Sequence, residues 1–504
     1  MSGAAWPSRP ESEQLTLRGH ASTADKTTDD YRYLPFEVRE GVRRIHVHYD
    51  YTRTSMAESR LGHENILDIG IFAPDAASGK PEAFRGWSGG ARTEFFIAPD
   101  AATPGYLPGP LPEGNWQIIL GLYRIAEGGC DYTVTVTLDA GASAGSVGGS
   151  SGTPERDLSR PPPPDEAPAL PGTWYIGDLQ SHTYHSDAKA SPAHLARVAQ
   201  HRGLEFLAVT DHNTISHHAE LSGLSNEGFL LIPAMEITTY YGHANAWGLS
   251  EWVDFRCRSS SDVARSVAVV RAQGAIVSIN HPYSDCPWTF GMISGVEAIE
   301  VWQGLWNRGN LQAVAWWDEL LTAGRRVTGV GGSDRHEPAH YDPLFPHQVG
   351  TPATRIRADE LSTSAILAGI LRGEVIIAET PQGPWLEIRV VRDDESFARM
   401  GDRITSMHGE EVAVECRVSG AGEDTLELVT NGRVAARHAL SLGEEKVLLR
   451  IPAADALYVR AQIVARRNDA PPVEESYPRI RALCNPIYLS HEVGNRREGS
   501  RVPD

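Results

Sequence analysis

The stretch WYIGDLQSHTYHSD, from Trp174 to Asp187, sets the fold of the middle of this chain. A short apolar run leads into the polar side chains Asp178, His182, His185 and Asp187. Such a run is typical of a buried strand that ends in a functional loop. Imidazoles and carboxylates are ligands of zinc and similar divalent ions. We therefore expect this strand to end at a metal site.

The segment 173–380 alternates short apolar runs with helix-like stretches. Ser191 and Pro192 begin one helical pattern as N-cap and first-turn proline, and Gly203 ends it. Because the alternation recurs about seven times, it predicts an α/β region with a mainly parallel sheet closed as a barrel.

Ligand-type side chains follow several of these apolar runs. They are Asp211-His212-Asn213, Glu236, His243, His281 and Asp334-Arg335-His336. Each alone has an ordinary explanation, such as a hydrogen-bonded loop histidine, a turn or an ion pair. Because parallel strands bring their carboxyl ends to one edge, their recurrence favours a metal site. Imidazole and carboxylate without thiolate suit zinc, manganese or iron, and more than one ion.

Five motifs between about 175 and 336 resemble those of the PHP metallohydrolases: GDLQSHTYHSD, VTDHN, EIT…GHANAWG, INHP and GGSDRH. They are most similar to the branch of carbaryl and carbofuran hydrolases, the CehA/McbA type. The flanking GGARTEFFIAPDAATPGYLPGPLPEGNWQIILG and CNPIYL resemble that branch too. The resemblance implies a distorted (β/α)7 PHP-type barrel that holds two or three divalent ions. It also implies hydrolysis of phosphoesters or, in this branch, of aryl carbamates and esters.

The resemblance implies a set of metal ligands in which Glu236 bridges two ions and His243 matches a position that varies. The set is His182, Asp187, His212, Glu236, His243, His281, Asp334 and His336. Gln180 stands where the first histidine is expected. Its amide oxygen is a weaker, neutral ligand, so we expect one ion to bind less tightly or to be absent.

Neighbouring residues are assigned supporting roles. We expect Asp211 to orient His212. His243, if it is not a ligand, would donate to the developing oxyanion or the leaving group. Arg335 would hold an anionic group of the substrate or form a structural ion pair. His185 matches no ligand position and is expected in an exposed loop or against the substrate.

Aromatic residues after two other runs have two readings. Tyr283, Trp302 and Trp306 would line an aromatic substrate pocket or pack in the core.

The flanking regions read as β structure. Residues 1–30 are polar without periodicity and predict a flexible tail. Alternating runs separated by Gly, Pro and Asp predict a β-sandwich over 31–140 and a smaller sandwich-like domain over 381–504. The Gly/Ser- and Pro-rich stretch 141–172 predicts a linker. We expect the β domains to shape the barrel mouth or to contact a second copy in a homo-oligomer.

Bulk properties exclude several classes of protein. A net charge of −19 argues against a nucleic-acid partner. No apolar run of about 18 residues is present, which argues against a membrane span. The first residues lack the features of a signal peptide. The five cysteines are dispersed and form no C-x-x-C, which favours the cytoplasm. A small-molecule substrate is the expected partner.

Three functions remain open. The first is a metal-dependent hydrolase of a small ester, carbamate or amide. The second is a PHP-type phosphoesterase, which the lack of an evident basic cluster beyond Arg335 disfavours. The third is a non-catalytic protein with a partly decayed metal site, which Gln180 keeps open.

Overall fold

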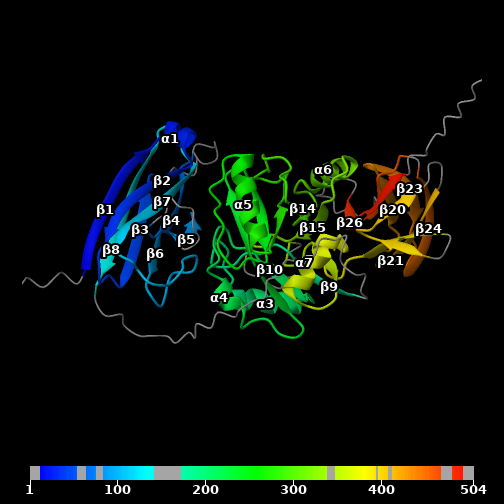
Figure 1. The fold of residues 1–504 in the computed structure, drawn as a ribbon, viewed down its shortest axis with the longest axis horizontal. Coiled ribbons are helices and arrows are strands. Elements are labelled where there is room, and N and C mark those ends of the chain that lie inside the picture. The colour runs from blue at the N-terminus through cyan, green and yellow to red at the C-terminus, as the bar shows by residue number, and fades with distance from the viewer. Residues whose placement is uncertain are drawn as a thin grey trace, which may run out of the picture.

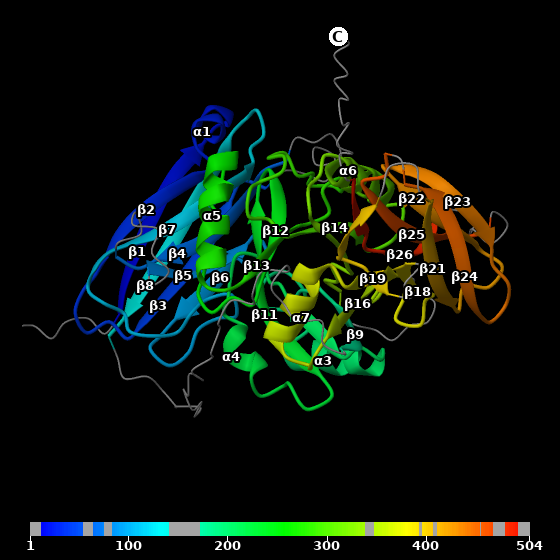
Figure 2. The same ribbon diagram turned by 45° about the vertical axis from the view of Figure 1, so that its right-hand side comes forward.

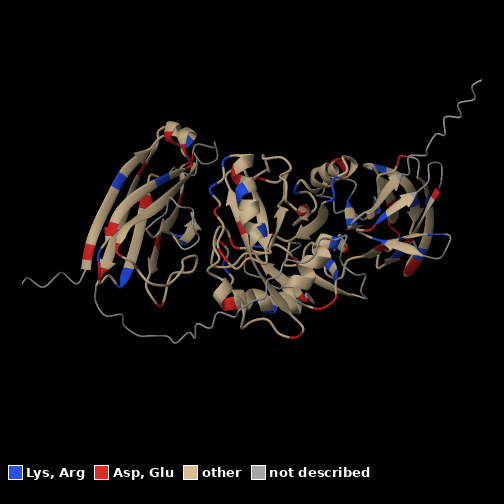
Figure 3. Ribbon diagram, viewed as in Figure 1, with Lys and Arg blue, Asp and Glu red and all other residues tan. Residues whose placement is uncertain are grey.

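The chain is a mixed α/β protein with many strands and few helices, seen in a computed structural model. It describes residues 12–53, 64–74, 83–140, 172–337, 347–392, 396–406, 411–453, 455–466 and 479–491. An N-terminal β part, a central α/β part and a C-terminal β part lie side by side (Figures 1 and 2). Charged residues of both signs occur in all three (Figure 3). No helix in these ranges is long and apolar enough to cross a membrane. Apart from Gly172, the expected linker 141–172 lies outside the described residues.

The N-terminal part consists of two four-stranded sheets, ordered β1-β8-β3-β6 and β2-β7-β4-β5. Its elements are β1 (Ser12–Ala21), α1 (Thr23–Thr28), β2 (Tyr31–Val38), β3 (Arg44–Tyr51), β4 (Ile66–Phe72), β5 (Phe84–Gly89), β6 (Glu94–Ile97), β7 (Gly114–Arg124) and β8 (Cys130–Asp139). One apolar cluster lies between the sheets. A second apolar cluster joins Phe84 and Trp87 of β5 to Trp252 and Phe255 of the central part. The sheet β2-β7-β4-β5 is therefore packed on both faces.

The prediction of a flexible tail over 1–30 is wrong from residue 12 onward. Strand β1 pairs antiparallel with β8 along its whole length, from Ser12 opposite Asp139 to Ala21 opposite Cys130. Ser22 and Asp25 then form a capping box that begins α1. The polar composition hid the strand, because only one face of this edge strand packs and only Leu15 and Leu17 mark it.

The central part carries most of the helices. Its elements are β9 (Thr173–Asp178), α3 (Pro192–His201), β10 (Phe206–Val209), α4 (His218–Leu221), β11 (Leu230–Thr239), β12 (Gly242–Trp247), α5 (Ser260–Ala272), β13 (Ile276–Ile279), β14 (Ala298–Gln303), α6 (Asn310–Thr322), β15 (Thr328–Gly332), β16 (Ala353–Ala358), α7 (Thr363–Arg372) and β17 (Val375–Ala378). Helix α3 begins at the predicted N-cap Ser191.

The regular strand–helix alternation predicted for this part is wrong in places. Strands β9, β10 and β11 are parallel neighbours, as are β13, β14 and β15. Strand β12, however, runs antiparallel to both β11 and β13. Only Tyr240 and Tyr241 separate β11 from β12, so the chain has no room for a crossover helix there.

The segments after the first and last of these parallel strands meet. The backbone N–H of Asp334 donates to the Gln180 carbonyl at 3.0 Å, and that of His182 donates to the Arg335 carbonyl at 3.2 Å. The buried carboxylate of Asp178 accepts from the Ser333 N–H at 2.9 Å and from the Gly350 N–H at 2.8 Å. Asp178 therefore holds these segments together. It does not belong to any of the groups of possible metal ligands among the described residues.

The C-terminal part continues the central sheet. Its strands are β18 (Trp385–Val391), β19 (Phe397–Arg399), β20 (Arg403–Ser406), β21 (Glu411–Ser419), β22 (Thr425–Thr430), β23 (Arg433–Ala439), β24 (Glu444–Pro452), β25 (Tyr458–Val464), β26 (Ile480–Cys484) and β27 (Ile487–His491). Strand β17 pairs with β26, and the sheet runs on through β25, β22 and β23. A second sheet, β19-β18-β21-β24, is joined to it by one apolar cluster.

Candidate metal centre

The side chains predicted as ligands converge at one end of the central sheet. They come from the loop after β9 (His182, Asp187), from the ends of β10 and β13 (His212, His281), from β11 and β12 (Glu236, His243), and from the segment after β15 (Asp334, His336). They form three overlapping groups whose ligand atoms lie within 4.8 Å of one another: His182, Asp187, His212 and His336; Glu236, His243 and His281; and His182, Glu236 and Asp334.

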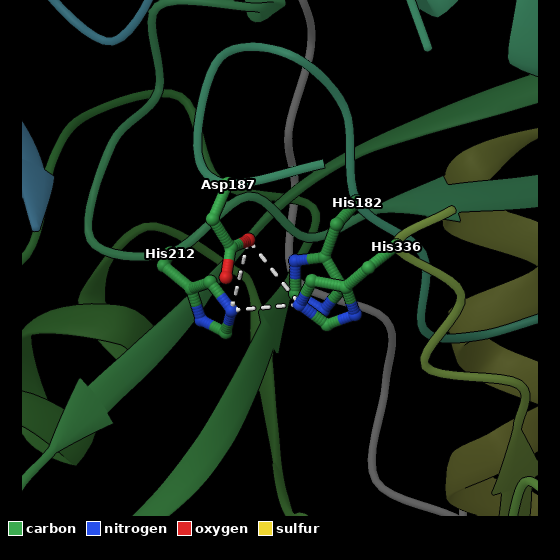
Figure 4. Close-up of side chains that lie close together, drawn as sticks. All are labelled: His182, Asp187, His212 and His336. Carbon is green, nitrogen blue, oxygen red and sulfur yellow. Dashed lines mark hydrogen bonds and ion pairs between the residues drawn. The ribbon is translucent and has the colours of Figure 1, made fainter. Parts of the chain in front are cut away.

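In the first group, the four side chains point toward one another (Figure 4). The Nε2 atoms of His212 and His336 are 3.2 Å apart. They lie 3.5 and 3.2 Å from Oδ1 of Asp187. Ligands of a tetrahedral zinc ion are separated by about 3.3 Å, given bonds of about 2.0–2.1 Å. The spacing therefore suits a shared divalent cation.

Glu236 lies between the groups and is fully buried. Its Oε2 is 2.8 Å from Nδ1 of His212, and its Oε1 is 3.3 Å from Nδ1 of His243 and from Nε2 of His281. Nδ1 of His182 is nevertheless buried without a hydrogen-bond partner among the described residues. An unpaired buried polar atom is costly. This donor set, with its unpaired imidazole nitrogen, fits divalent cations.

Gln180 faces this cluster. Its Nε2 donates to Oε1 of Glu236 at 3.0 Å and to Oδ1 of Asp334 at 3.3 Å, so the amide lies between two carboxylates. Two more amides, which sequence reasoning missed, bind the same carboxylates: Asn280 donates to Glu236 at 2.9 Å and Gln303 to Asp334 at 2.7 Å. The position of Asn280, directly before His281 in INHP, was the available signal.

The expectation that Asp211 orients His212 is wrong. The Asp211 carboxylate accepts from the Thr183 N–H at 2.7 Å and from the Ser186 hydroxyl at 2.6 Å, and it pairs with His217 at 3.1 Å. Burial raises the pKa of Asp211, but His217 and these donors outweigh it and bring the pKa to about 2. Consecutive side chains at a strand end point to opposite sides, so Asp211 holds the loop between His182 and Asp187 instead.

His185 is buried rather than in an exposed loop. Its Nδ1 lies 2.7 Å from the Ser216 hydroxyl, and its Nε2 lies 2.9 Å from Oε1 of Glu220. Through these contacts, His185 connects the loop after β9 to the segment after β10 and stabilises both.

A first cavity of about 410 Å³ opens on the metal-ligand cluster. Its lining includes His212, His243 and His281, the guanidinium groups of Arg308 and Arg335, and the carboxylates of Asp285, Asp334 and Glu337. His347 lines it too, and burial lowers the pKa of its imidazole. Burial lowers the pKa of His243, but Glu236 and a hydrogen bond with Cys286 outweigh it, so the pKa is raised to about 10. Sequence reasoning identified Arg335 and missed Arg308, His347 and Cys286, which no motif marks.

A second cavity of about 460 Å³ lies on another side of the cluster, between the N-terminal and central parts. Asp187, His212 and His243 meet Asp68, Trp87 and Tyr123 there. Trp302 and Trp306 are buried in the core, and neither they nor Tyr283 are among the residues described as lining these two cavities. The described aromatic lining of the second cavity consists of Trp87 and Tyr123 from the N-terminal strands and Tyr240 from the central part.

The N-terminal part also holds the ligand-bearing loops. Arg92 donates to the Ser186 carbonyl at 2.9 Å and to the Tyr184 carbonyl. The carbonyl of Gly105 accepts from the Thr214 hydroxyl at 3.0 Å. Gly105 has φ of +99°, and a Cβ there would lie 2.8 Å from the His185 carbonyl oxygen, so only glycine allows this approach.

No family model matches the chain. An uncharacterized protein of Methanocaldococcus jannaschii is 29% identical over 119 residues, which cover 21% of this chain and 67% of the relative. A two-domain protein from Bacteroides vulgatus, named for a predicted PHP-like metal-dependent phosphoesterase, is 18% identical with a TM-score of 0.36, over 59% of this chain and 92% of that one. An amidohydrolase from Chromobacterium violaceum, with bound sulfate and no metal, is 16% identical with a TM-score of 0.23, over 34% and 93%. The functional argument for this chain therefore rests on its own side chains.

Proposed function

We propose that the protein is a metal-dependent hydrolase of a small ester, carbamate or amide, built on a distorted PHP-type barrel. The observation that carries the proposal is the convergence of imidazole and carboxylate groups from separate strands around the buried Glu236. Two or three divalent ions (zinc, manganese or iron) suit this donor set.

The proposed ligand groups divide around Glu236. His182, Asp187, His212 and His336 would hold one ion, His243 and His281 would hold a second with Glu236, and Asp334 would complete a third position with His182. When bound, such ions lower the pKa of water and polarise the substrate's carbonyl or phosphoryl oxygen.

The surrounding residues fix this arrangement and position the substrate. Asn280 and Gln180 orient the Glu236 carboxylate through hydrogen bonds. Asp211 and Arg92 hold the loop that carries Asp187. Arg335 and Arg308 face the first cavity, where they would orient an electron-rich oxygen of the substrate.

A phosphoesterase is the second candidate, and the first cavity favours it. Arg308 lines this cavity together with Arg335, so two guanidinium groups are present where the sequence marked one. Guanidinium groups bind phosphate oxygens with two parallel hydrogen bonds. The same residues also suit an oxyanion or a carboxylate, so the substrate panel has to separate the two reactions.

The test is metal quantification on the full-length chain expressed with zinc, manganese or iron, followed by hydrolysis assays. Turnover of 1-naphthyl acetate or 1-naphthyl methylcarbamate supports the first function, and turnover of 4-nitrophenyl phosphate alone supports the second. A chain that retains no metal and hydrolyses none of these supports a non-catalytic protein and overturns the proposal.

Two variants sharpen the assay. Glu236→Gln removes the central charge and should lower metal content and turnover by at least about a hundredfold. Gln180→His restores an imidazole and should raise metal occupancy. Unchanged metal occupancy and activity in Gln180→His would contradict the expectation that Gln180 weakens the binding of one ion.

A further inference from the structure

The hairpin of β11 and β12 carries proposed ligands on both of its strands, and the two residues of its turn, Tyr240 and Tyr241, contact the N-terminal part. We infer that Tyr240 is a positioning residue: the N-terminal sheet holds its side chain and thereby fixes the places of Glu236 and His243. The inference rests on the proposed function, which makes these two side chains metal ligands.

The pairing of the two strands connects the turn to the ligands. Glu236 lies opposite Asn245, and Thr238 lies opposite His243. The Thr238 hydroxyl is 2.6 Å from Nδ1 of His212, a proposed ligand from the end of the neighbouring β10. Because hydrogen-bonded strands move as one unit, a displacement of the turn would displace Glu236, Thr238 and His243 together.

Residues from several elements of the N-terminal part hold Tyr240. Its hydroxyl donates to Oδ2 of Asp68 on β4 at 2.7 Å. Its ring stacks on Tyr31 of β2 at 5.7 Å and packs against Tyr123 of β7 at 5.1 Å between ring centroids. Nζ of Lys26 in α1 lies 4.3 Å from the ring centroid. Ring packing and a hydrogen bond to a charged acceptor together restrict the ring to one position.

Gly121 on β7 shows how closely the sheet fits Tyr240. A Cβ at this glycine would overlap the Tyr240 hydroxyl and would lie 2.9 Å from Trp87. Glycine in a strand often marks a site where another part of the chain approaches the backbone closely. The sheet β2-β7-β4-β5 therefore receives the tip of Tyr240 directly against its backbone.

Tyr241 provides a second contact between the turn and the N-terminal part. Its hydroxyl donates to Oδ1 of Asp30 at 3.2 Å. Asp30 is buried and pairs with Lys26 at 2.6 Å and with Arg258 at 3.0 Å. Both tyrosines of the turn thus bind carboxylates of the N-terminal part, Asp30 and Asp68. A turn that only closed a hairpin would need neither contact.

The test is competition for Zn²⁺ between the full-length chain and a chromophoric chelator. Gly121→Ala forces Tyr240 out of its position and should weaken zinc affinity about 10–100-fold. Gly19→Ala is the matched control, because its Cβ would overlap the hydroxyl of Tyr132 within the other sheet of the sandwich. Its zinc affinity should equal that of the parent. Parent-like affinity in Gly121→Ala, or equal losses in the two variants, would overturn the inference.

Two further variants test the contact itself. Tyr240→Phe keeps the ring, loses the hydroxyl and should weaken zinc affinity about three- to tenfold. If Gly121→Ala does not fold, parent-like affinity in Tyr240→Phe would overturn the inference. In the double variant the added methyl group meets no hydroxyl, so Gly121→Ala with Tyr240→Phe should bind zinc more tightly than Gly121→Ala alone. A double variant that binds no more tightly would contradict the assignment to Tyr240.

Hydrogen exchange separates this inference from the proposed function. Without added metal, the backbone amides of residues 236–247 should exchange at least about tenfold faster in Gly121→Ala and at the parent's rate in Gly19→Ala. If the parent binds zinc but hydrolyses no ester or phosphate, the proposed function fails and zinc affinity still decides the role of Tyr240. If the parent binds no metal, the proposed function fails, and unchanged exchange in Gly121→Ala would overturn the positioning role as well.

Discussion

The N-terminal and C-terminal β parts both flank the central sheet, but they contact it in different ways. The N-terminal part contacts it through side chains: Arg92 binds the loop before Asp187, and Trp87 and Asp68 line a cavity beside the proposed ligands. The C-terminal part contacts it through backbone pairing, since β17 pairs with β26, and through the buried ion pair of Arg460 and Asp318.

This difference predicts a division of roles. Side chains that hold ligand-bearing loops set geometry at the site, so N-terminal substitutions should change metal binding and substrate choice. Backbone pairing and buried ion pairs far from the site set stability, so C-terminal substitutions should change unfolding and leave the metal stoichiometry of the folded chain unaltered.

The largest expected effect is on stability, at the C-terminal contact. Arg460 is buried, and its Nη2 lies 2.6 Å from Oδ2 of Asp318. Arg460→Met leaves a buried carboxylate unpaired and should lower the free energy of unfolding by about 3–5 kcal/mol. Urea unfolding measures the loss, and metal analysis of the folded chain should show unchanged stoichiometry. Loss of metal from folded Arg460→Met would break the comparison.

A smaller stability loss is expected at Asn485. Its Oδ1 accepts from the Gly329 N–H, and its Nδ2 donates to the Gly329 carbonyl, each at 2.8 Å, so it completes the backbone pairing of β15. Asn485→Leu leaves both groups unpaired and should cost about 1–3 kcal/mol. Urea unfolding tests this value, and an unaltered midpoint would contradict it.

The main expected effect of an N-terminal substitution is on metal binding. Arg92→Met frees the loop between His182 and Asp187 and should weaken metal affinity about 10–100-fold. The control is Arg124→Met in the same part, whose guanidinium pairs with Glu64 and is half exposed. Competition with a chromophoric chelator measures both affinities. Equal affinities for Arg92→Met and the parent would contradict the claim that the N-terminal part sets the geometry of the metal site.

The last expected effect is a pH dependence of stability that comes from Asp68. Burial raises its pKa to about 6, above the unfolded value of about 3.9. The folded chain therefore binds this proton more tightly, so the contribution to stability is present below about pH 4 and is lost as the pH rises through 6. Asp68→Asn should gain about 2 kcal/mol relative to the parent between pH 4 and 7. Urea unfolding across this range measures the difference in free energy of unfolding between each variant and the parent. This difference should change with pH for Asp68→Asn and stay constant for Arg124→Met, which keeps Asp68.

Much of the candidate site was predictable, because ligand-type residues recur after apolar runs. His182, Glu236 and Asp334, which are far apart in the sequence, converge because the sheet brings its strand ends to one edge. The carboxylates Asp178 and Asp211 were harder to place, since a strand end offers side chains to two sides and the sequence does not say which side a given residue takes.

By itself, the sequence determined many of the strands, the start of α3 at Ser191 and the residue types at the strand ends, since these follow from local periodicity and capping. Only the tertiary structure decided which groups meet. The amides of Gln180 and Asn280 on Glu236, and the cavity wall formed by Asp68 and Trp87 opposite Asp187, are contacts between distant segments. Such contacts depend on how sheets pack and twist, which no local pattern encodes.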